Sequence, residues 1–490
     1  MASNVTKYRE AVRTHWEANR LDRAIAEAWK GYDATPENPA AKALVARLLR
    51  ACPEEVGADR LPALRRLLND RDIDPGAIAP AGWQYLLLFS DLFSATADQA
   101  ATAERLEANP FARELLAQDP VTNLRAEMAL VQLRRWLRLS GRWREFPRSV
   151  EALTRQATLN DGAWGFDSEE RAPLDGDDAA AITGAYPPER QGGAGRSTAD
   201  DPVTRAVAEQ YESWPYPQWV RVTVDEQTTL PSDVRKLDPD GPDTIPQAAE
   251  ILIAGCGTGR QAAIAALRYP DAQITAIDIS KASLGYAAAR CGEAGLHGIS
   301  FRALDLHRVG ELGRSFDAVF CSGVLHHLPD PERGWTALAD VLKPGGVMHV
   351  MVYSKIARLS IRALRASIAD LESCPVDDDL LREVRRRIFE RGLPGAPKSR
   401  DFFSLSGVHD ILLHRHEDPF DVPRIRRALE RLGLELIQFK LPTPQDKAGY
   451  RVQNPHDPLH RDFAAWSKTE RRNPSLFSGM YDFWCRKPVT

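Results

Sequence analysis

The sequence has few cysteines and no long apolar run, and both absences narrow the class of protein. The six cysteines are widely separated and form no C-x-x-C pair, which argues against a disulfide framework and a zinc knuckle. No apolar run approaches the roughly 18 residues of a membrane span. The opening stretch, MASNVTKYREAVRTHWE, also has no apolar core. We therefore expect a cytoplasmic protein without a membrane span.

An excess of charge of one sign is absent as well. The formal net charge is -4 and the sequence pI is about 6.3, so no global field would attract nucleic acid, and we expect no such partner. Hydrophobic residues make up 43% of the chain, as in ordinary globular proteins. A chain of 490 residues exceeds what one core usually holds, which predicts two or three domains.

Three glycines at alternate positions follow directly on a buried-strand pattern. Residues 251–259 read ILIAGCGTG, and a helical pattern follows over Arg260–Arg268. Glycines in this arrangement let the backbone turn sharply and let a ligand approach it closely. The first amides of the helix then face the ligand. The alternative interpretation is a turn that binds nothing.

Two acidic residues close the next two predicted strands. Asp278 ends the run ITAI about 20 residues after the glycines, where a carboxylate can accept hydrogen bonds from ribose hydroxyls. Asp305 lies in FRALDL at the end of a third strand, where a carboxylate can accept from an adenine amino group. Further strands are predicted at 316–321, 347–353, 434–441 and 480–486. The pattern predicts an α/β domain that binds a nucleoside-containing ligand.

Taken in order, these motifs resemble the class I S-adenosylmethionine-dependent methyltransferases. GCGTG, Asp278, Asp305, FDAVFCSGVLHHLPDP and LKPGGVMHVMV follow the family order over about residues 250–353. The resemblance implies a Rossmann-like seven-stranded methyltransferase sheet with an antiparallel last strand, and S-adenosyl-L-methionine as cofactor. It also implies a cofactor-binding set made of Gly255, Cys256, Gly257, Gly259, Asp278, Ile279, Asp305, Leu306 and Ser322.

One position departs from the family pattern. The family commonly has an acidic residue two positions before the first glycine, and this chain has Ile253 there. The departure supports one alternative, a non-catalytic interaction protein that keeps the methyltransferase fold. NAD binding is a second alternative. NAD loops favour G-x-G-x-x-G, whereas this loop is G-x-G-x-G, and a dehydrogenase would not need the LKPGG turn.

Residues 1–160 are predicted to form an all-α domain. Ala24, Ala28, Gly31 and Pro36 have the small-residue spacing and closing proline of one tetratricopeptide repeat. Later segments keep helical periodicity without that consensus. We therefore predict a degenerate tetratricopeptide-like helical domain. A plain helical bundle is the alternative, because a solenoid normally needs about three repeats.

Residues 161–202 are rich in Gly, Pro, Asp and Ser, which predicts a linker before a methyltransferase domain at 203–490. That domain opens on QYESWPYPQWV, where prolines stiffen a segment with four aromatic residues: Tyr211, Trp214, Tyr216 and Trp219. The segment resembles the YExxPYPxW element of a mostly uncharacterised bacterial group that couples tetratricopeptide-like helices to this fold. The rings either attach the linker to the domain or form a lid that excludes water.

Residues 355–421 are predicted to be a helical insertion in the methyltransferase domain. Its basic run, LREVRRRIFERG, is either a solvated helix face or a site for an acidic partner. Its later part, DFFSLSGVHDILLHRHEDPF, holds polar groups that could face a cleft, including His409 and His414. These two histidines and Tyr353 join the four aromatic residues as candidate substrate or lid residues.

His326 and His327 follow the fourth predicted strand, at the edge where parallel sheets of this kind bind ligands. Either could be a catalytic general base, because imidazole titrates near neutral pH. The alternative is a structural pair. His414, His416 and Glu417 form an H-x-H-E pattern, but no distant third ligand can be identified, so we predict no metal.

Two classes of methyl acceptor are open. A helical-repeat domain can supply a groove for a peptide, which favours a protein or peptide acceptor held partly by the helical domain. VLHHLPDP resembles small-molecule methyltransferases such as those of quinone biosynthesis, which favours a small metabolite, lipid or secondary-metabolite scaffold. We predict the protein or peptide acceptor, with the small molecule as the alternative.

Overall fold

A computed structural model of the chain describes residues 2–94, 98–171, 182–186, 190, 201–224, 226–371, 374–390, 400–441, 443–477 and 479–489. By its contacts, the chain divides into two units. The first comprises Met1–Gln191, Gln218–Asp225 and Ile368–Ile411, and the second comprises Gly192–Pro217, Glu226–Ser367 and Leu412–Thr490. Across the described ranges, every helix is too short or too polar to cross a lipid bilayer.

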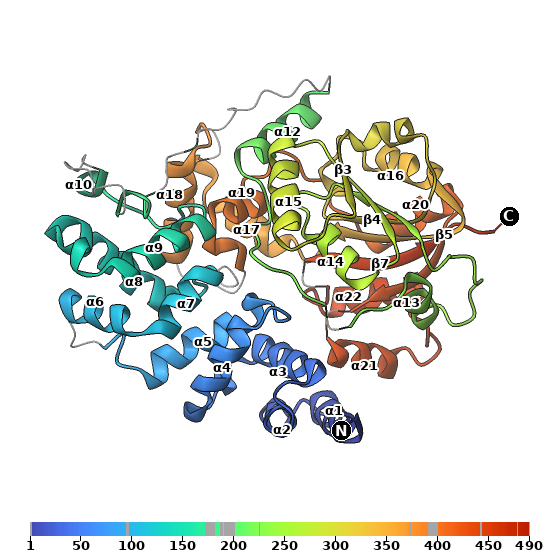
Figure 1. The fold of residues 1–490 in the computed structure, drawn as a ribbon. Coiled ribbons are helices and arrows are strands. Elements are labelled where there is room, and N and C mark those ends of the chain that lie inside the picture. The colour runs from blue at the N-terminus through green and yellow to red at the C-terminus, as the bar shows by residue number, and fades with distance from the viewer. Residues whose placement is uncertain are drawn as a thin grey trace. The chain divides into compact units, whose positions relative to one another are not determined.

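The first unit is built from helices (Figure 1). Their bounds are α1 (Ala2–Glu17), α2 (Leu21–Ala34), α3 (Pro39–Ala51), α4 (Leu61–Asn69), α5 (Pro75–Phe89), α6 (Gln99–Ala108), α7 (Pro110–Gln118), α8 (Leu124–Ser140), α9 (Pro147–Leu159), α10 (Ser168–Arg171), α18 (Asp378–Glu390) and most of α19 (Leu405–Leu412). Small residues let α1 and α2 approach, because a Cβ at Gly31 would lie 3.1 Å from the Cβ of Tyr8. The predicted helical character is confirmed, and the tetratricopeptide relationship stays a prediction.

The predicted insertion at 355–421 is divided between the two units. Ile368–Ile411 packs with the N-terminal helices rather than with the sheet. A buried ion pair explains this placement, because Arg385 of α18 donates to the Glu127 carboxylate of α8 at 2.5 Å and both side chains are less than one tenth exposed. Arg385 and Glu127 are far apart in sequence. The boundary between the two units could therefore not be predicted from the order of segments along the chain.

The predicted linker at 161–202 starts inside the packed first unit. Asp161 is buried, and its carboxylate accepts hydrogen bonds from the Ser406 N–H at 3.2 Å and from Arg190 at 3.3 Å. Ile182 is fully buried in the same apolar core. These described residues are therefore packed into the first unit. Residues 172–181, 187–189 and 191–200 lie outside the described part of the chain.

The basic run on α18 is paired within the chain. Arg386 contacts Glu383 at 2.8 Å, and Arg387 contacts Glu383 at 2.7 Å and Asp370 at 2.5 Å. Arg391 lies outside the described residues. Because the described arginines of α18 already have carboxylate partners, the structure does not favour a site for an acidic partner on this helix.

The second unit contains a seven-stranded sheet with the order β3-β2-β1-β4-β5-β7-β6. Its strands are β1 (Glu250–Ala254), β2 (Gln273–Asp278), β3 (Ile299–Ala303), β4 (Phe316–Ser322), β5 (Leu342–Tyr353), β6 (Glu435–Lys440) and β7 (Met480–Arg486). β7 pairs antiparallel with both β5 and β6, and the pairs among β1 to β5 are parallel. The predicted Rossmann-like sheet is confirmed.

Apolar residues on both faces keep the central strands buried, as expected for parallel strands covered by helices. Successive side chains of a strand point to opposite faces, so Leu252 of β1 belongs to one apolar cluster and Ile253 to the other. Ile253, where the family commonly has an acidic residue, is therefore a fully buried core residue here.

Helices cover both faces of this sheet (Figure 1). α13 (Leu230–Leu237), α14 (Arg260–Arg268) and α15 (Lys281–Glu293) contribute to one apolar cluster. α16 (Pro331–Asp340), α20 (Val422–Leu432), α21 (Pro444–Gln453) and α22 (Phe463–Arg472) contribute to the other. The remaining helices of the unit are α12 (Pro202–Ser213), before the sheet, and α17 (Leu359–Ala366), after β5.

Candidate functional site

The glycine loop, residues 255–259, connects β1 to α14 and turns through left-handed backbone. Gly255, Gly257 and Gly259 have φ values of 69°, 52° and 80°, which residues with a side chain rarely adopt. The N–H groups of Gly255 and Cys256 both donate to the Ile277 carbonyl at 2.9 Å. These bonds hold the loop against the end of β2, beside the amides that begin α14.

Carboxylates follow β2 and β3 as predicted. Asp278 accepts hydrogen bonds from the Gly257 N–H at 2.7 Å and the Ser280 N–H at 2.9 Å, and burial raises the pKa of its carboxyl. Asp305 accepts from the His307 backbone at 2.9 Å and contacts His307 Nδ1 at 3.1 Å. That imidazole lowers the pKa of the Asp305 carboxyl. His307 was not predicted, because an isolated histidine after a strand carries no motif.

The other predicted cofactor residues lie at the same edge. The Ser322 hydroxyl, at the end of β4, accepts from Gln261 Nε2 of α14 at 2.8 Å. Cys256 and Leu306 are buried, and Ile279 is half-buried beside Asp278. Burial raises the pKa of the Cys256 thiol, so this thiol stays protonated. Because β3, β2, β1 and β4 are neighbours in the sheet, all nine predicted cofactor residues gather at one edge.

Residues 211–217, which we term the covering segment, lie on the glycine loop. A Cβ at Gly257 would be 2.8 Å from the Tyr216 carbonyl oxygen, and the Thr258 hydroxyl donates to the Pro217 carbonyl. Glu212, at the end of α12, accepts from the first amides of α15 at 2.5 and 3.0 Å. Trp219, predicted with this group, belongs to the first unit instead.

His326 and His327 form a short helical turn after β4, and both are buried. The Tyr353 N–H donates to His326 Nδ1 at 3.1 Å, and the two rings stack with centroids 3.9 Å apart. His327 Nδ1 donates to the His416 carbonyl at 2.8 Å. The turn is therefore attached to the end of β5 and to the chain after α19.

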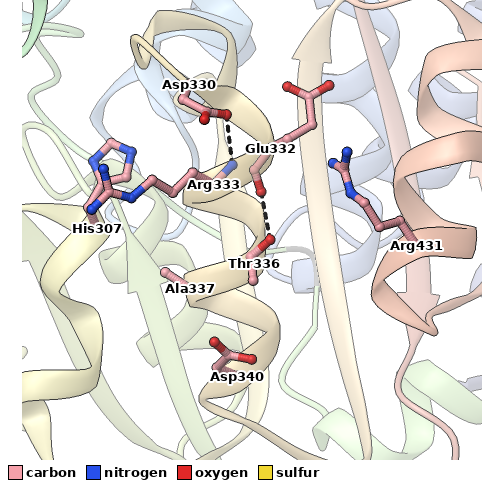
Figure 2. Close-up of a pocket in the computed structure, with 8 residues that line it drawn as sticks. All are labelled: His307, Asp330, Glu332, Arg333, Thr336, Ala337, Asp340 and Arg431. Carbon is pink, nitrogen blue, oxygen red and sulfur yellow. Dashed lines mark hydrogen bonds between the residues drawn. The ribbon is translucent and has the colours of Figure 1, made fainter.

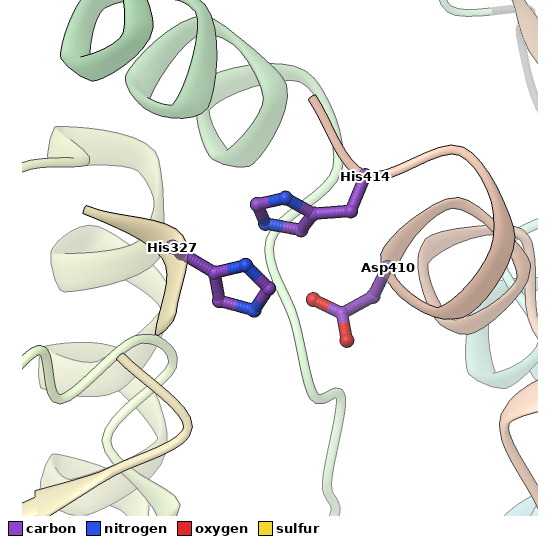
Figure 3. Close-up of side chains that lie close together, drawn as sticks. All are labelled: His327, Asp410 and His414. Atoms are coloured by element: carbon purple, nitrogen blue, oxygen red, sulfur yellow. The ribbon is translucent and has the colours of Figure 1, made fainter. Parts of the chain in front are cut away.

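His414 lies against His327 although the two are far apart in sequence. Their rings stack with centroids 3.5 Å apart and planes 19° apart (Figure 3). His414 Nε2 lies 3.2 Å from the Tyr211 hydroxyl, so the covering segment also contacts this group. We term His326, His327, Tyr353 and His414 the histidine cluster. His409, on α19, belongs to the first unit, as does Asp410, which Figure 3 also draws.

Burial controls the charge of the two consecutive histidines. It lowers the pKa of His326 well below its usual range and lowers that of His327 to about 3, and the Arg358 guanidinium adds to both effects. Both imidazoles are therefore neutral near pH 7.

The H-x-H-E pattern forms an ion-pair network. Glu417 accepts from Arg358 and, at 3.2 Å, from Arg365, and Arg365 also donates to the His414 carbonyl at 3.1 Å. Arg358 lies over the Tyr353 ring at 4.2 Å. Two guanidinium groups thus occupy the Glu417 carboxylate, and the absence of a metal here stays a prediction.

A surface groove of about 680 Å³ lies along α16 and is lined by His307, Asp330, Glu332, Arg333, Thr336, Ala337, Asp340 and Arg431 (Figure 2). Asp330 caps α16 by accepting from the Arg333 N–H at 2.9 Å, and Glu332 pairs with Arg424 at 2.7 Å. The lining contains none of the predicted site residues. Asp330 and Glu332 already have partners within the chain, and we assign no function to the groove.

Comparison with known proteins finds a matching family and several relatives. Residues 251–346 match a family described as "Methyltransferase domain". An uncharacterised protein of Synechococcus is 33% identical over 301 residues, which are 55% of this chain and 68% of that protein. A trans-aconitate 2-methyltransferase of Deinococcus radiodurans is 33% identical over 30% of this chain and 53% of its own length. A structure of PKMT2 from Rickettsia typhi with AdoHcy is 18% identical over 52% of this chain and 53% of that one, with a TM-score of 0.40.

The sheet order, the glycine loop and the matched domain together define a class I S-adenosylmethionine-dependent methyltransferase. The chain belongs to the same family as the Synechococcus protein. It spans about half the length of the Deinococcus relative. The identification favours an enzyme over the non-catalytic and NAD-binding alternatives.

The residues at this edge fit S-adenosylmethionine. Asp278 would accept from ribose hydroxyls and Asp305 from the adenine amino group, while the glycine loop and the first amides of α14 would be available to polar groups of the cofactor. When bound, the cofactor supplies an activated sulfonium methyl group. The protein then has to hold the acceptor in line and manage its proton.

Proposed function

We propose that this protein transfers the methyl group of S-adenosylmethionine to a small-molecule acceptor at the histidine cluster. The observation that carries the proposal is the burial of the histidine cluster at the carboxyl ends of β4 and β5. His326 is 0%, His327 5% and Tyr353 9% exposed, so the acceptor atom must reach side chains that are almost closed from solvent. A compact acceptor meets this condition more readily than a folded protein surface. Catalysis by the histidines and cofactor contacts by the predicted residues are parts of the proposal.

The named relative gives the same preference. The Deinococcus protein is named for trans-aconitate, a small molecule. The sequence alone favoured a protein acceptor because of the helical domain. The depth of the histidine cluster supports the small-molecule acceptor instead.

A protein or peptide acceptor is the second candidate, because the first unit exposes large apolar side chains. Leu88 and Phe89 of α5 are 56% and 44% exposed, and Met128 and Leu139 of α8 are 57% and 44% exposed. Exposed apolar side chains on a helical scaffold can contact an extended peptide. In this reading the helical unit would hold the chain of the substrate.

Calorimetry with S-adenosylmethionine and S-adenosylhomocysteine tests the cofactor half. We expect micromolar binding by the wild type, and a loss of at least about tenfold in Asp278→Ala, because the variant removes the carboxylate and the support of the Gly257 N–H. Asp271→Ala, on the exposed turn before β2, is the matched control and should bind as the wild type does. Absence of binding by the wild type would contradict the proposed function.

Transfer of a labelled methyl group distinguishes the acceptors. The enzyme is incubated with tritiated S-adenosylmethionine and either protein-free extract or the dialysed protein fraction of the cells that make it. Label in the protein-free extract is expected. Label found only in protein would favour the second candidate instead. That candidate would be established if the label is also lost in a preparation that lacks residues 1–160.

A further inference from the structure

We propose that the consecutive histidines have opposite roles in methyl transfer. His327 takes the proton of the methyl acceptor through Nε2, and His326 donates a hydrogen bond to the same molecule through its Nε2–H. This inference rests on the proposed function and goes beyond it by fixing a role for each imidazole. It also defines the chemical class of the acceptor.

His326 is held as the tautomer with its proton on Nε2. Its Nδ1 faces the Tyr353 N–H at 3.1 Å, and a backbone N–H can only donate, so Nδ1 must be the acceptor. The neutral ring then carries its proton on Nε2. That nitrogen is buried and has no hydrogen-bond partner among the described residues. A buried donor without a partner is costly and is satisfied when a bound molecule brings an acceptor atom.

His327 is held as the opposite tautomer. Its Nδ1 faces the His416 carbonyl at 2.8 Å, and a carbonyl can only accept, so Nδ1 must carry the proton. The lone pair of the neutral ring is therefore on Nε2. The backbone carbonyl behind the imidazole orients it, and this hydrogen bond partly offsets the lowering of the His327 pKa by burial and by the Arg358 guanidinium, which favours uptake of a proton.

His414 does not compete for the role of base. Its Nδ1 accepts from the His416 N–H at 3.1 Å, so the neutral ring carries its proton on Nε2, which faces the Tyr211 hydroxyl. The ring stacks on His327 and fixes its plane. Of the three imidazoles, only that of His327 has an unprotonated Nε2. His414 is a positioning residue.

These assignments define the reaction step. The acceptor atom, an oxygen or nitrogen that carries a proton, forms a bond to the methyl carbon while the carbon–sulfur bond breaks and its electron pair stays on sulfur. The proton of the acceptor passes to His327 Nε2. The ring centroids of His326 and His327 are 4.2 Å apart, so the two imidazoles are direct neighbours at this end of the sheet. The methyl acceptor is therefore a hydroxyl or amine compound with a second hydrogen-bonding oxygen or nitrogen close to the methylated atom.

Asparagine substitution separates the two roles. Asparagine can place an amide oxygen or nitrogen near the position of imidazole Nδ1, so His326→Asn can still accept from Tyr353 and His327→Asn can still donate to His416. Each variant removes only the Nε2 function. The two variants are matched controls for one another.

The first measurement is ¹⁵N NMR of the full chain with ¹⁵N-labelled histidine rings. Eleven histidines contribute, and the signals of His326 and His327 are assigned by their loss in the two variants. We expect Nε2 to be protonated in His326 and unprotonated in His327. Reversed or identical tautomers would overturn the inference, and this readout needs neither acceptor nor cofactor.

The second measurement is methyl transfer from tritiated S-adenosylmethionine into protein-free cell extract. His327→Asn is expected to lose about 100-fold or more in rate, as for removal of a general base, and His327→Gly should be partly restored by added imidazole. His326→Asn should lose about tenfold and gain nothing from imidazole. Equal losses, or rescue of neither histidine, would overturn the inference.

Calorimetry of S-adenosylmethionine binding keeps the two ideas distinguishable. Wild-type protein that fails to bind would contradict the proposed function itself. Wild-type protein that binds and transfers methyl groups, but has the wrong tautomers or no imidazole rescue, would leave that function intact and remove only the assignment of roles to His326 and His327.

Discussion

Backbone amides and strand-end carboxylates form the glycine-loop side of the site, whereas four rings from distant segments form the histidine cluster. On the glycine-loop side, each group is placed by the strand or turn that contains it, as Asp278 is by β2. In the histidine cluster, His326 and His327 depend on backbone groups of Tyr353 and His416. Changes on the first side should therefore act on cofactor binding. Changes in the second should act on turnover and on pH dependence.

The largest expected effect would break the glycine-loop side. Gly257→Ala should weaken S-adenosylmethionine binding by about 100-fold, or about 2.7 kcal/mol, measured by calorimetry. The reason is twofold: the φ of 52° is strained for alanine, and the new Cβ would lie 2.8 Å from the Tyr216 carbonyl oxygen. The covering segment would have to move away from the loop.

Gly295→Ala is the control for this change. Gly295 also has a left-handed φ, of 73°, but its Cβ would meet nothing within 4 Å. We expect a small loss of stability and unchanged cofactor affinity. Equal losses of affinity in both variants would mean that backbone strain alone, and not the contact with Tyr216, explains the effect.

The next effect sharpens the comparison through pH. The pKa of His327 is about 3 in the folded protein against about 6.5 in an unfolded chain, so the unfolded state binds the proton first as pH falls. The contribution of His327 to the free energy of unfolding is therefore fully present above about pH 6.5 and is lost progressively toward pH 3. Between pH 6.5 and 5, this single group should cost roughly 2 kcal/mol.

Urea denaturation at pH 7 and pH 5 measures this term. His327→Asn should lose about 2 kcal/mol less than the wild type over that interval, because asparagine does not titrate. Replacing Asp278 on the other side of the site should leave the acidic loss from His327 in place. An unchanged pH dependence in His327→Asn would show that the imidazole is not kept neutral by burial.

The smallest effect tests whether the covering segment serves both sides. Tyr211→Phe removes the hydroxyl beside His414 Nε2, a single hydrogen bond worth about 1 kcal/mol, so methyl transfer should fall about fivefold. Cofactor affinity should stay within about twofold of the wild type. Tyr286→Phe, on α15, is the control and should change neither. A loss of cofactor affinity in Tyr211→Phe would make the segment part of the glycine-loop side alone.

Local patterns allowed most of the sheet and the glycine-loop side to be predicted. The strands ending at Asp278 and Ser322 could be predicted because apolar runs and glycines determine the backbone conformation of their immediate neighbours. The antiparallel pairing of the last strand followed from the family resemblance. The domain boundaries were less readable, because α18 packs through Arg385 on Glu127 of a helix far away in sequence.

By itself, the sequence determined the class of fold and the positions of the loop glycines and carboxylates, since backbone conformation and strand order specify these. The cofactor was indicated by the resemblance to a known family. Only the tertiary structure decided that His414 stacks on His327, that Glu417 pairs with arginines, and that His326 and His327 face different backbone groups. The physical reason is that an imidazole has two nitrogens. Which of them carries the proton depends on the partner that folding places beside it.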